Sequence, residues 1–382
     1  MALKSRLGFG MMRLPVKHGD PTDIDFEQLN PMVDEFIRAG FTYFDTSYVY
    51  HNGKSEEATR KAVVERYPRD AFTVATKFPT FSLTDEAEIE PIFSKQLENL
   101  GVDSIDYYLL HNIQTVYYDG IDGKGGIVKQ ARLFDHANRW KADGRIRHLG
   151  ISFHSSAKLL DRILTEHPEI EFVQIPFNYI DARSELVQAM ASYEVIRRHG
   201  KQAVFMEPVK GGGLAKVPEM AARKLRGMDP GATIVSWAIR YAGSFDGVLC
   251  NLSGMSTLEQ VKDNIRSVQT LEPLNEGEMG QLDEVVRLYR DAGEIGADLE
   301  RYRGLVWHGV PVTGILETYN MCLLQPDPGF SDDNNYLKNA VAEAAHLDIF
   351  GALPAESAVL ADGTDATALV AKAEKWLIEH SF

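Results

Sequence analysis

The feature that most constrains the fold is a repeated alternation of short apolar runs with longer segments of helical periodicity. Runs such as 107-YYLL and 172-FVQI are apolar almost throughout, which is typical of parallel strands buried on both faces. The segments between the runs space their apolar residues as one face of a helix. The expected strands are 6–11, 42–46, 72–77, 105–111, 146–152, 171–175, 203–207 and 247–253. The expected helices are 26–39, 55–66, 86–100, 128–143, 156–166, 184–199, 231–242 and 257–268.

Eight strands alternating with eight helices predict a parallel sheet that is either closed into a barrel or open and doubly wound. The number of units favours the barrel. A dinucleotide-binding open sheet would carry a GxGxxG turn after its first strand, and 8-GFGMMR does not fit that pattern. The predicted fold class is therefore α/β, a (β/α)8 TIM barrel with a C-terminal helical extension.

The barrel pattern ends near residue 270, and a helix expected at 277–293 packs on it. We therefore expect a barrel domain over residues 1–285 and a helical extension over 286–382. Helical pieces are expected at 314–324 and 366–380, separated by a loop-rich section that contains 325-QPDPGFSDDNN.

Composition narrows the classes of function. The 382-residue chain has a net charge of −15, which argues against a nucleic-acid binder. Its two cysteines, Cys250 and Cys322, cannot build a disulfide framework or a cysteine-ligated metal site, and we expect no metal. No apolar run approaches the length of a membrane span, and the N-terminus lacks the pattern of a secretion signal. We expect a soluble cytoplasmic protein.

Polar residues stand at the predicted strand ends, where barrel enzymes carry their chemistry. Asp45 ends the second strand, Lys77 the third and His111 the fourth, and Tyr50 follows Asp45 by five residues. The later strands end in Ser152, Gln174, Glu207 and Ser253.

The first four of these residues form a coherent chemical set. A lysine ammonium beside a tyrosine hydroxyl favours the phenolate, and a carboxylate holds the lysine charged. A neutral histidine can donate to a substrate oxygen, so the set suits proton donation to a carbonyl. Each residue alone is more often a cap, a surface charge or a core histidine. Their occurrence together on three consecutive strand ends favours function.

Several segments resemble the aldo-keto reductases in family order across residues 6–268. They are 7-LGFGMMRLP, 45-DTSYVYHNGKSE, 74-VATKF, 105-IDYYLLH, 144-GRIRHLGIS, 172-FVQIPFN and 254-GMSTLEQVKDN. The resemblance implies an NAD(P)(H)-dependent oxidoreductase that acts on a small carbonyl or alcohol, either an aldehyde, a ketone or a sugar. It makes Tyr50 the general acid and base, with Lys77 activating it, Asp45 pairing with Lys77 and His111 orienting the carbonyl.

The resemblance also implies cofactor positions. Ser152 and Gln174 match the residues that hold the nicotinamide carboxamide, although Phe153 stands where relatives often have asparagine. Met206 takes the place of a nicotinamide-stacking aromatic residue. The segment 207-EPVKGGGL matches the loop over the pyrophosphate, where Lys210 can meet a phosphate. The residues carried over here are Ser152, Gln174, Met206, Glu207, Lys210, Gly211 and Gly212.

The last strand and helix match the adenosine end of the cofactor site. The residues carried over are Ser253, Ser256, Gln260, Asp263 and Asn264. Met255 stands where a cation often precedes the serine, which weakens the case for a 2′-phosphate. The family default favours NADP(H), and NAD(H) stays possible.

The segment 309-GVPVTGILETYNMCLL resembles bacterial members of the family that carry a C-terminal ferredoxin-like extension. In those relatives, cysteine motifs bind iron–sulfur clusters, and here the motifs are absent. The expectation is a degenerate extension without an iron–sulfur cluster. Three roles are compatible with the sequence of the extension: it covers the barrel mouth, shapes the substrate pocket or mediates dimerisation. The oligomeric state is therefore either a monomer or a homodimer.

The long loop 112–127 after His111 is expected to help form the substrate site. Tyr117 and Tyr118 either stack on a substrate ring or pack the loop onto the barrel. The remaining substrate candidates are Tyr48, His51 and Phe78; relatives usually have glycine at the position of His51.

Two other functions compete with a reductase. A cofactor-binding regulatory subunit would keep the fold with little turnover, and the intact set of four residues argues against it. A lyase or isomerase would use Lys77 as a Schiff base.

Overall fold

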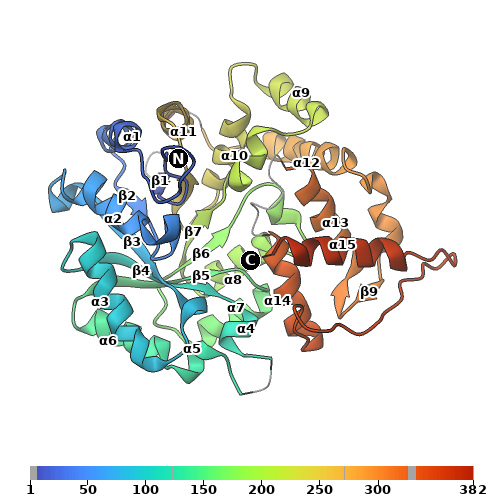
Figure 1. The fold of residues 1–382 in the computed structure, drawn as a ribbon. Helices are drawn as coiled ribbons and strands as arrows, with labels where there is room; N and C mark the ends of the chain where they lie inside the picture. The colour runs from blue at the N-terminus through green and yellow to red at the C-terminus, as the bar shows by residue number, and fades with distance from the viewer. Residues whose placement is uncertain (1–6, 122–123, 271, 326–332, 382) are drawn as a thin grey trace.

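Eight parallel strands form a closed barrel in chain order, with β1 paired to both β2 and β8 (Figure 1). The computed structural model describes residues 7–121, 124–270, 272–325 and 333–381. The strands are β1 (Leu7–Gly10), β2 (Tyr43–Asp45), β3 (Thr73–Phe78), β4 (Ile105–Ile113), β5 (Ile146–Phe153), β6 (Phe172–Pro176), β7 (Gln202–Met206) and β8 (Val248–Gly254). The predicted (β/α)8 barrel is confirmed.

Helices surround the barrel and bury their apolar stripes against it. In α1, Asp25 caps the first turn and Leu29, Met32, Val33 and Phe36 are buried. The helices of this layer are α1 (Phe26–Arg38), α2 (Ser55–Thr59), α3 (Ile89–Leu100), α4 (Thr115–Tyr118), α5 (Ile127–Gln130), α6 (Leu133–Ala142), α7 (Ala157–Glu166), α8 (Ala189–Arg198), α9 (Glu219–Met228), α10 (Ile234–Gly243), α11 (Leu258–Thr270) and α12 (Glu276–Asp291).

Three predicted helices differ clearly from the structure. The helix expected at 184–199 begins only at Ala189 as α8, because Gln188 before it adopts a left-handed φ of 53°. The helix expected at 128–143 is divided into α5 and α6, because Arg132 between them adopts a left-handed φ of 52°. The break allows Val128, Leu133 and Phe134 all to be buried. The helix expected at 55–66 begins as α2 and continues as a π turn over Arg60–Val64. Helix α9 lies in a segment where no helix was expected.

The barrel interior is filled by side chains of unequal size. Tyr43, Leu109 and Phe172 lie in one buried cluster with residues of β3, β7 and β8, which are Ala75, Val204, Met206, Cys250 and Leu252. A Cβ atom on Gly150 would lie 2.5 Å from the Phe172 ring. Glycine on β5 therefore makes room for this aromatic residue, and the interior is a packed core.

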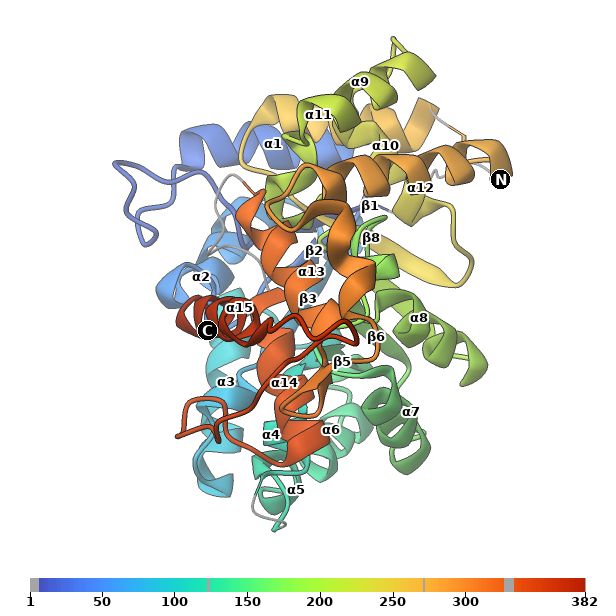
Figure 2. The same ribbon diagram turned by 90° about the vertical axis from the view of Figure 1, so that its right-hand side faces the viewer.

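The C-terminal extension forms helices that pack against one side of the barrel, and Figure 2 shows them in front of it. The extension contains a 3-10 turn (Gly296–Tyr302), β9 (Val306–Trp307), β10 (Val310–Pro311), α13 (Val312–Leu323), α14 (Asp333–Ala345) and α15 (Thr367–Glu379). Helix α14 corrects the prediction of a loop-rich section there. Among the residues of α14 whose burial is described, the large buried apolar side chains are Tyr336, Leu337 and Val341. Packing on α13 and α15 therefore supports the helix more than its own periodicity does.

Polar contacts fix the extension internally. His308 on the β9–β10 turn is 2% exposed, its Nδ1 lies 2.6 Å from Glu374 Oε1, and its Nε2 lies 2.9 Å from the Pro354 carbonyl oxygen. Cys250 and Cys322 are both buried, and they do not form a disulfide. Within the described ranges, none of the helices has the length and apolar character that crossing a bilayer requires.

Candidate active site

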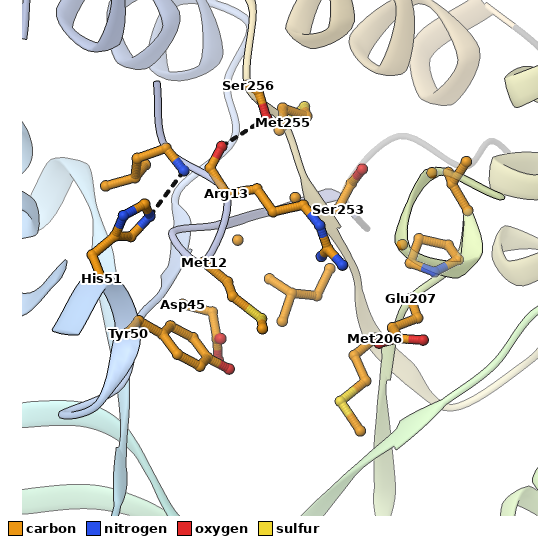
Figure 3. A pocket seen from close by; sticks show the side chains of 18 of the residues that line it. Met12, Arg13, Asp45, Tyr50, His51, Met206, Glu207, Ser253, Met255 and Ser256 are labelled. Atoms are coloured by element: carbon orange, nitrogen blue, oxygen red, sulfur yellow. Dashed lines mark hydrogen bonds between the residues drawn. The ribbon is translucent and has the colours of Figure 1, made fainter. Parts of the chain in front are cut away.

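A cavity of about 1140 Å³ opens at the C-terminal ends of the strands. In Figure 3, Asp45 and Tyr50 lie on one side of it and Met206, Glu207 and Ser253 on the other. The sequence-predicted residues that line it are Asp45, Tyr50, His51, His111, Tyr117, Gln174, Met206, Glu207, Gly211, Gly212, Ser253, Ser256, Gln260, Asp263 and Asn264. Those outside the lining are Tyr48, Lys77, Phe78, Tyr118, Ser152 and Lys210.

Lys77 lies beneath the cavity with no exposure to solvent. Its ammonium donates to Asp45 Oδ1 and, at 2.7 Å, to the Thr46 carbonyl oxygen. Burial disfavours the ammonium, but the Asp45 carboxylate and the Tyr50 hydroxyl outweigh it and raise the pKa of Lys77. The lysine is therefore held as a cation at the floor of the cavity.

Tyr50 lies directly above this cation. Lys77 Nζ is 4.7 Å from the centroid of the Tyr50 ring. The tyrosine begins a turn in which His51, Asn52 and Gly53 all have positive φ, an unusual backbone that returns the chain to α2. Ser55 holds the start of that helix by donating to the Met11 carbonyl oxygen at 2.9 Å.

His111 completes the group from the neighbouring strand. Its ring centroid is 5.9 Å from that of Tyr50, at an interplanar angle of 82°. The Ser47 hydroxyl lies 3.2 Å from His111 Nδ1 and fixes the ring orientation. Burial, together with the charge of Lys77, holds the pKa of His111 well below its usual value. A neutral imidazole can donate one N–H to a substrate oxygen in the cavity.

His51 is bound to the backbone through both ring nitrogens. Its Nε2 accepts from the Leu14 amide at 3.1 Å, a bond drawn at His51 in Figure 3. The proton is therefore on Nδ1, which donates to the Pro21 carbonyl oxygen at 2.9 Å. Burial lowers the pKa of His51. The ring lines the cavity but is occupied in holding the loop after β1, rather than being available as a substrate donor.

The wall made by β6 and β7 presents an open acceptor. Gln174 is 1% exposed, and its Nε2 donates to the Met206 sulfur at 3.4 Å. Its Oε1 has no hydrogen-bond partner among the described residues. A buried carbonyl oxygen left in this state at a cavity wall is suited to receive an N–H donor from a bound molecule.

The glycine-rich loop after β7 contributes backbone to the cavity, whereas its lysine points away. Gly211 and Gly212 have φ values of 62° and 101°, and a Cβ on Gly212 would meet no described atom within 4 Å. Lys210 is 2% exposed and lies 2.5 Å from Asp181 in a buried ion pair. It therefore anchors the loop, and nothing in this geometry directs it to a phosphate.

The end of β8 and the start of α11 form the far part of the cavity. Asn264 Nδ2 donates to Ser253 Oγ at 2.7 Å, and the Ser256 amide donates to Gln260 Oε1 at 2.7 Å. The Ser256 hydroxyl donates to the Arg13 carbonyl oxygen at 2.8 Å. Asp263 accepts from Thr233 at 2.9 Å. The bond between Ser256 and Arg13 joins the loop after β1 to the predicted adenosine end.

Several cavity residues were not singled out by the sequence. Ser152 accepts from the Asn112 amide at 2.8 Å instead of lining the cavity, and Asn112 and His154 line it in its place. Phe81 lies 5.4 Å from the His111 ring. Arg13 lines the wall near β8, and Asn335 and Lys338 arrive from α14. Asn112 directly follows the expected strand 105–111, and Arg13 comes two residues after the expected strand 6–11, so the sequence offered a signal for both. It offered none for the α14 residues.

Comparisons with known proteins agree with this fold. A model of the aldo/keto reductase family matches residues 6–287. An aldo-keto reductase of Mycolicibacterium vanbaalenii is 27% identical over 253 residues, which cover 65% of this chain and 79% of the relative. L-galactose dehydrogenase of Arabidopsis thaliana is 23% identical over 323 residues, covering 79% and 93%.

Solved structures share the fold at low identity. An aldo-keto reductase from Klebsiella pneumoniae in complex with NADPH superposes with a TM-score of 0.56 at 19% identity, covering 74% of this chain and 90% of that one. The holo form of an aldo-keto reductase from Bacillus halodurans gives a TM-score of 0.58 at 24% identity, with coverage of 75% and 95%. The chain belongs to the aldo/keto reductase family and is an NAD(P)-dependent oxidoreductase.

Proposed function

We propose that the enzyme transfers a hydride between a nicotinamide cofactor, with NADP(H) favoured, and the carbonyl carbon of an aldehyde, ketone or sugar. The observation that carries the proposal is the buried Lys77 cation, paired with Asp45 and lying under the Tyr50 ring beside a neutral His111. This arrangement supports negative charge on the tyrosine oxygen at the cavity floor.

The residues of the cavity fit a nicotinamide cofactor. The Gln174 Oε1 acceptor suits a carboxamide N–H, and the open space beside the Gly212 backbone suits close approach of a diphosphate. Arg13 adds a guanidinium near β8, where Met255 is buried and supplies no charge. The bound NADPH of the Klebsiella relative supports NADP(H) over NAD(H). When bound, the cofactor supplies or accepts the hydride.

The chain's own residues supply the proton chemistry. In reduction, Tyr50 gives its phenolic proton to the substrate oxygen as negative charge develops there, and Lys77 stabilises the resulting phenolate. Asp45 keeps Lys77 charged and oriented, and His111 donates a hydrogen bond that places the carbonyl. In alcohol oxidation, the Tyr50 phenolate takes the proton back.

Lys77 is a poor Schiff-base nucleophile in this arrangement, because it is protonated, fully buried and outside the cavity lining. The division into a barrel over 1–285 and an extension over 286–382 is part of the proposal. We also propose that the extension is a degenerate ferredoxin-like region without an iron–sulfur cluster. The proposed location of the protein is the cytoplasm.

The test is a cofactor titration followed by a panel of aldehydes, ketones, sugars and alcohols with both NADP(H) and NAD(H), in which nicotinamide absorbance is monitored. The expected result is turnover of at least one carbonyl, with a lower KM for NADPH than for NADH. Tight cofactor binding without turnover across the panel would instead favour a regulatory subunit.

A further inference from the structure

Helix α14 of the extension is attached to the barrel at the ends of β4 and β5, beside α4 (Figures 1 and 2). Asn339 Nδ2 donates to the His154 carbonyl oxygen at 2.5 Å, and the Ser156 hydroxyl donates to Glu343 Oε2 at 2.5 Å. The Tyr336 and His154 rings lie 6.3 Å apart. These contacts hold α14 against the segment that follows β5, next to β4, which carries His111.

The attachment brings two polar side chains to the cavity. Asn335 and Lys338 stand three residues apart on α14 and therefore share a face with Asn339. They are 5% and 8% exposed, and both line the cavity that Tyr50 and His111 also line. The Lys338 ammonium is 5.5 Å from the Phe350 ring centroid, and its four-carbon chain allows it to reorient toward a bound anion.

The charges around the cavity are unevenly distributed. The acidic residues of its lining are Asp45, which is paired with Lys77, and Glu207, Glu259 and Asp263, which follow β7 and β8. The lining that comes from β4, β5 and α14 consists of His111, Asn112, Tyr117, His154, Asn335 and Lys338. None of these described residues is acidic.

The surroundings of Lys338 resemble those of a binding residue more than those of a surface charge. Burial lowers the pKa of Lys338, and the charge of Asp348 opposes this effect. An ammonium in such a place is stabilised further by an anion that brings a second charge into the cavity. The wall that carries Lys338 lies at the ends of β4 and β5, across the closed barrel from β8 and on the same side of the cavity as His111. A carbonyl substrate placed by His111 would extend along this wall.

We propose that Lys338 and Asn335 select a carbonyl substrate that carries an organic anion, a carboxylate or a phosphate ester. This substrate class rests on the proposed reductase function and makes the extension a part of the substrate site. The ammonium of Lys338 binds the anion by a charge-assisted hydrogen bond, and the Asn335 amide adds a neutral donor.

The experiment compares kcat/KM within two matched pairs, using the full-length enzyme and saturating NADPH. One pair is 4-carboxybenzaldehyde and its methyl ester, and the other is glyceraldehyde 3-phosphate and glyceraldehyde. The variants are Lys338→Met, which keeps the apolar chain, and Lys338→Arg, which keeps the charge. Lys375→Met on α15, where the side chain is 75% exposed, is the matched control.

In at least one pair, the wild-type enzyme is expected to have a higher kcat/KM for the anionic substrate than for the neutral one. The pair that shows this preference identifies the recognised anion as a carboxylate or a phosphate. Lys338→Met should reduce that preference about tenfold or more. Lys338→Arg should retain most of it, and Lys375→Met all of it. The KM for NADPH should stay the same in Lys338→Met.

Turnover without a preference for either anion would overturn the substrate class while leaving the reductase function intact. The substrate class would also be overturned if Lys338→Met lowered kcat/KM equally for the anionic and the neutral substrate of a pair. A raised KM for NADPH in Lys338→Met would overturn it as well. Failure of the folded wild-type enzyme to reduce any carbonyl would overturn the reductase function, and the substrate class with it.

Discussion

Lys77 and Asp45 form an ion pair that is closed to solvent, with side-chain exposures of 0% and 1%. The pair joins the ends of β2 and β3 directly below Tyr50. A buried charge without its partner is costly, so the two residues depend on each other for stability as well as for the proposed chemistry.

Replacement of one partner should therefore destabilise the protein strongly. Lys77→Met or Asp45→Asn is expected to lower the free energy of unfolding by about 3–5 kcal/mol, whereas the double variant Lys77→Met/Asp45→Leu should recover most of the loss. Urea denaturation measures all three. The double variant should remain inactive, which separates the catalytic role from the structural one.

The exposed pair Lys375–Glu379 provides the comparison, because removal of a surface ion pair changes stability by only about 0–1 kcal/mol. Equal effects at the surface pair and at the buried pair would contradict the interpretation of Lys77 and Asp45.

His51→Asn should loosen the loop after β1. Asparagine tolerates the left-handed φ of 52° but cannot reach the Leu14 amide, so the free energy of unfolding should fall by about 1–3 kcal/mol at pH 8. Because the folded pKa of His51 is lowered, its contribution is fully present above pH ~6.5 and is lost as the pH falls toward the folded pKa. Urea titrations from pH 5 to 8 should show that the difference in the free energy of unfolding between His51→Asn and the wild type becomes smaller as the pH falls.

His18→Asn is the matched control for His51, since His18 is exposed on the same loop and has a φ of 55°. The assignment of His51 as a neutral acceptor for the Leu14 amide would be excluded by either of two results. One is a loss of stability in His51→Asn that does not change with pH, and the other is an equal loss in His18→Asn.

His308 should show the opposite pH dependence. Both of its ring nitrogens face acceptors, so the ring binds best as a cation. Burial alone would lower the pKa of His308, but the Pro354 carbonyl and Glu374 outweigh it and raise that pKa. Its stabilising contribution is therefore fully present below pH ~6.5 and is lost as the pH rises through the folded pKa.

The Tm of His308→Asn should accordingly lie furthest below that of the wild type near pH 6 and closest to it at alkaline pH. Thermal unfolding at a series of pH values measures this difference. A gap that widens with rising pH would contradict the cationic assignment.

Arg13→Met should weaken cofactor binding. Arg13 lies against the end of β8, where a Cβ on Gly254 would be 3.4 Å from its Nη1, and it lines the same cavity as Gly211 and Gly212. Loss of a cation near a diphosphate should raise the KM for NADPH and NADH alike by about tenfold and reduce the dependence of KM on salt. Arg38→Gln, at a side chain that is 68% exposed, is the control. Unchanged KM values in Arg13→Met would exclude the contact.

The fold could be predicted because its signals are local. Apolar runs such as 107-YYLL mark strands buried on both faces, and polar residues at their ends mark the open end of the barrel. Asp45, Tyr50 and His111 therefore reach one cavity as expected, and Lys77 lies just below it. Their catalytic roles stay predictions until turnover is measured.

The rest depended on contacts between distant parts of the chain. No periodicity indicates that Asn339 binds His154, 185 positions away, and so places Lys338 in the cavity. Similarly, Lys210 was predicted to meet a phosphate because it stands beside glycines, but Asp181 is close enough to pair with it. His51 lines the cavity, as expected of a substrate candidate, but no sequence pattern indicates that two backbone groups of the loop after β1 bind its ring.

Tyr50→Phe removes the proposed proton donor. The variant removes only the hydroxyl above Lys77, and Tyr67→Phe, whose hydroxyl donates to Asp34 away from the cavity, is its control. With NADPH and the best carbonyl of the panel, kcat should fall by about 10²–10⁴-fold in Tyr50→Phe while NADPH binding, followed by fluorescence, is preserved. Carbonyl reduction at the wild-type rate by folded Tyr50→Phe would contradict the assignment of Tyr50 as the proton donor.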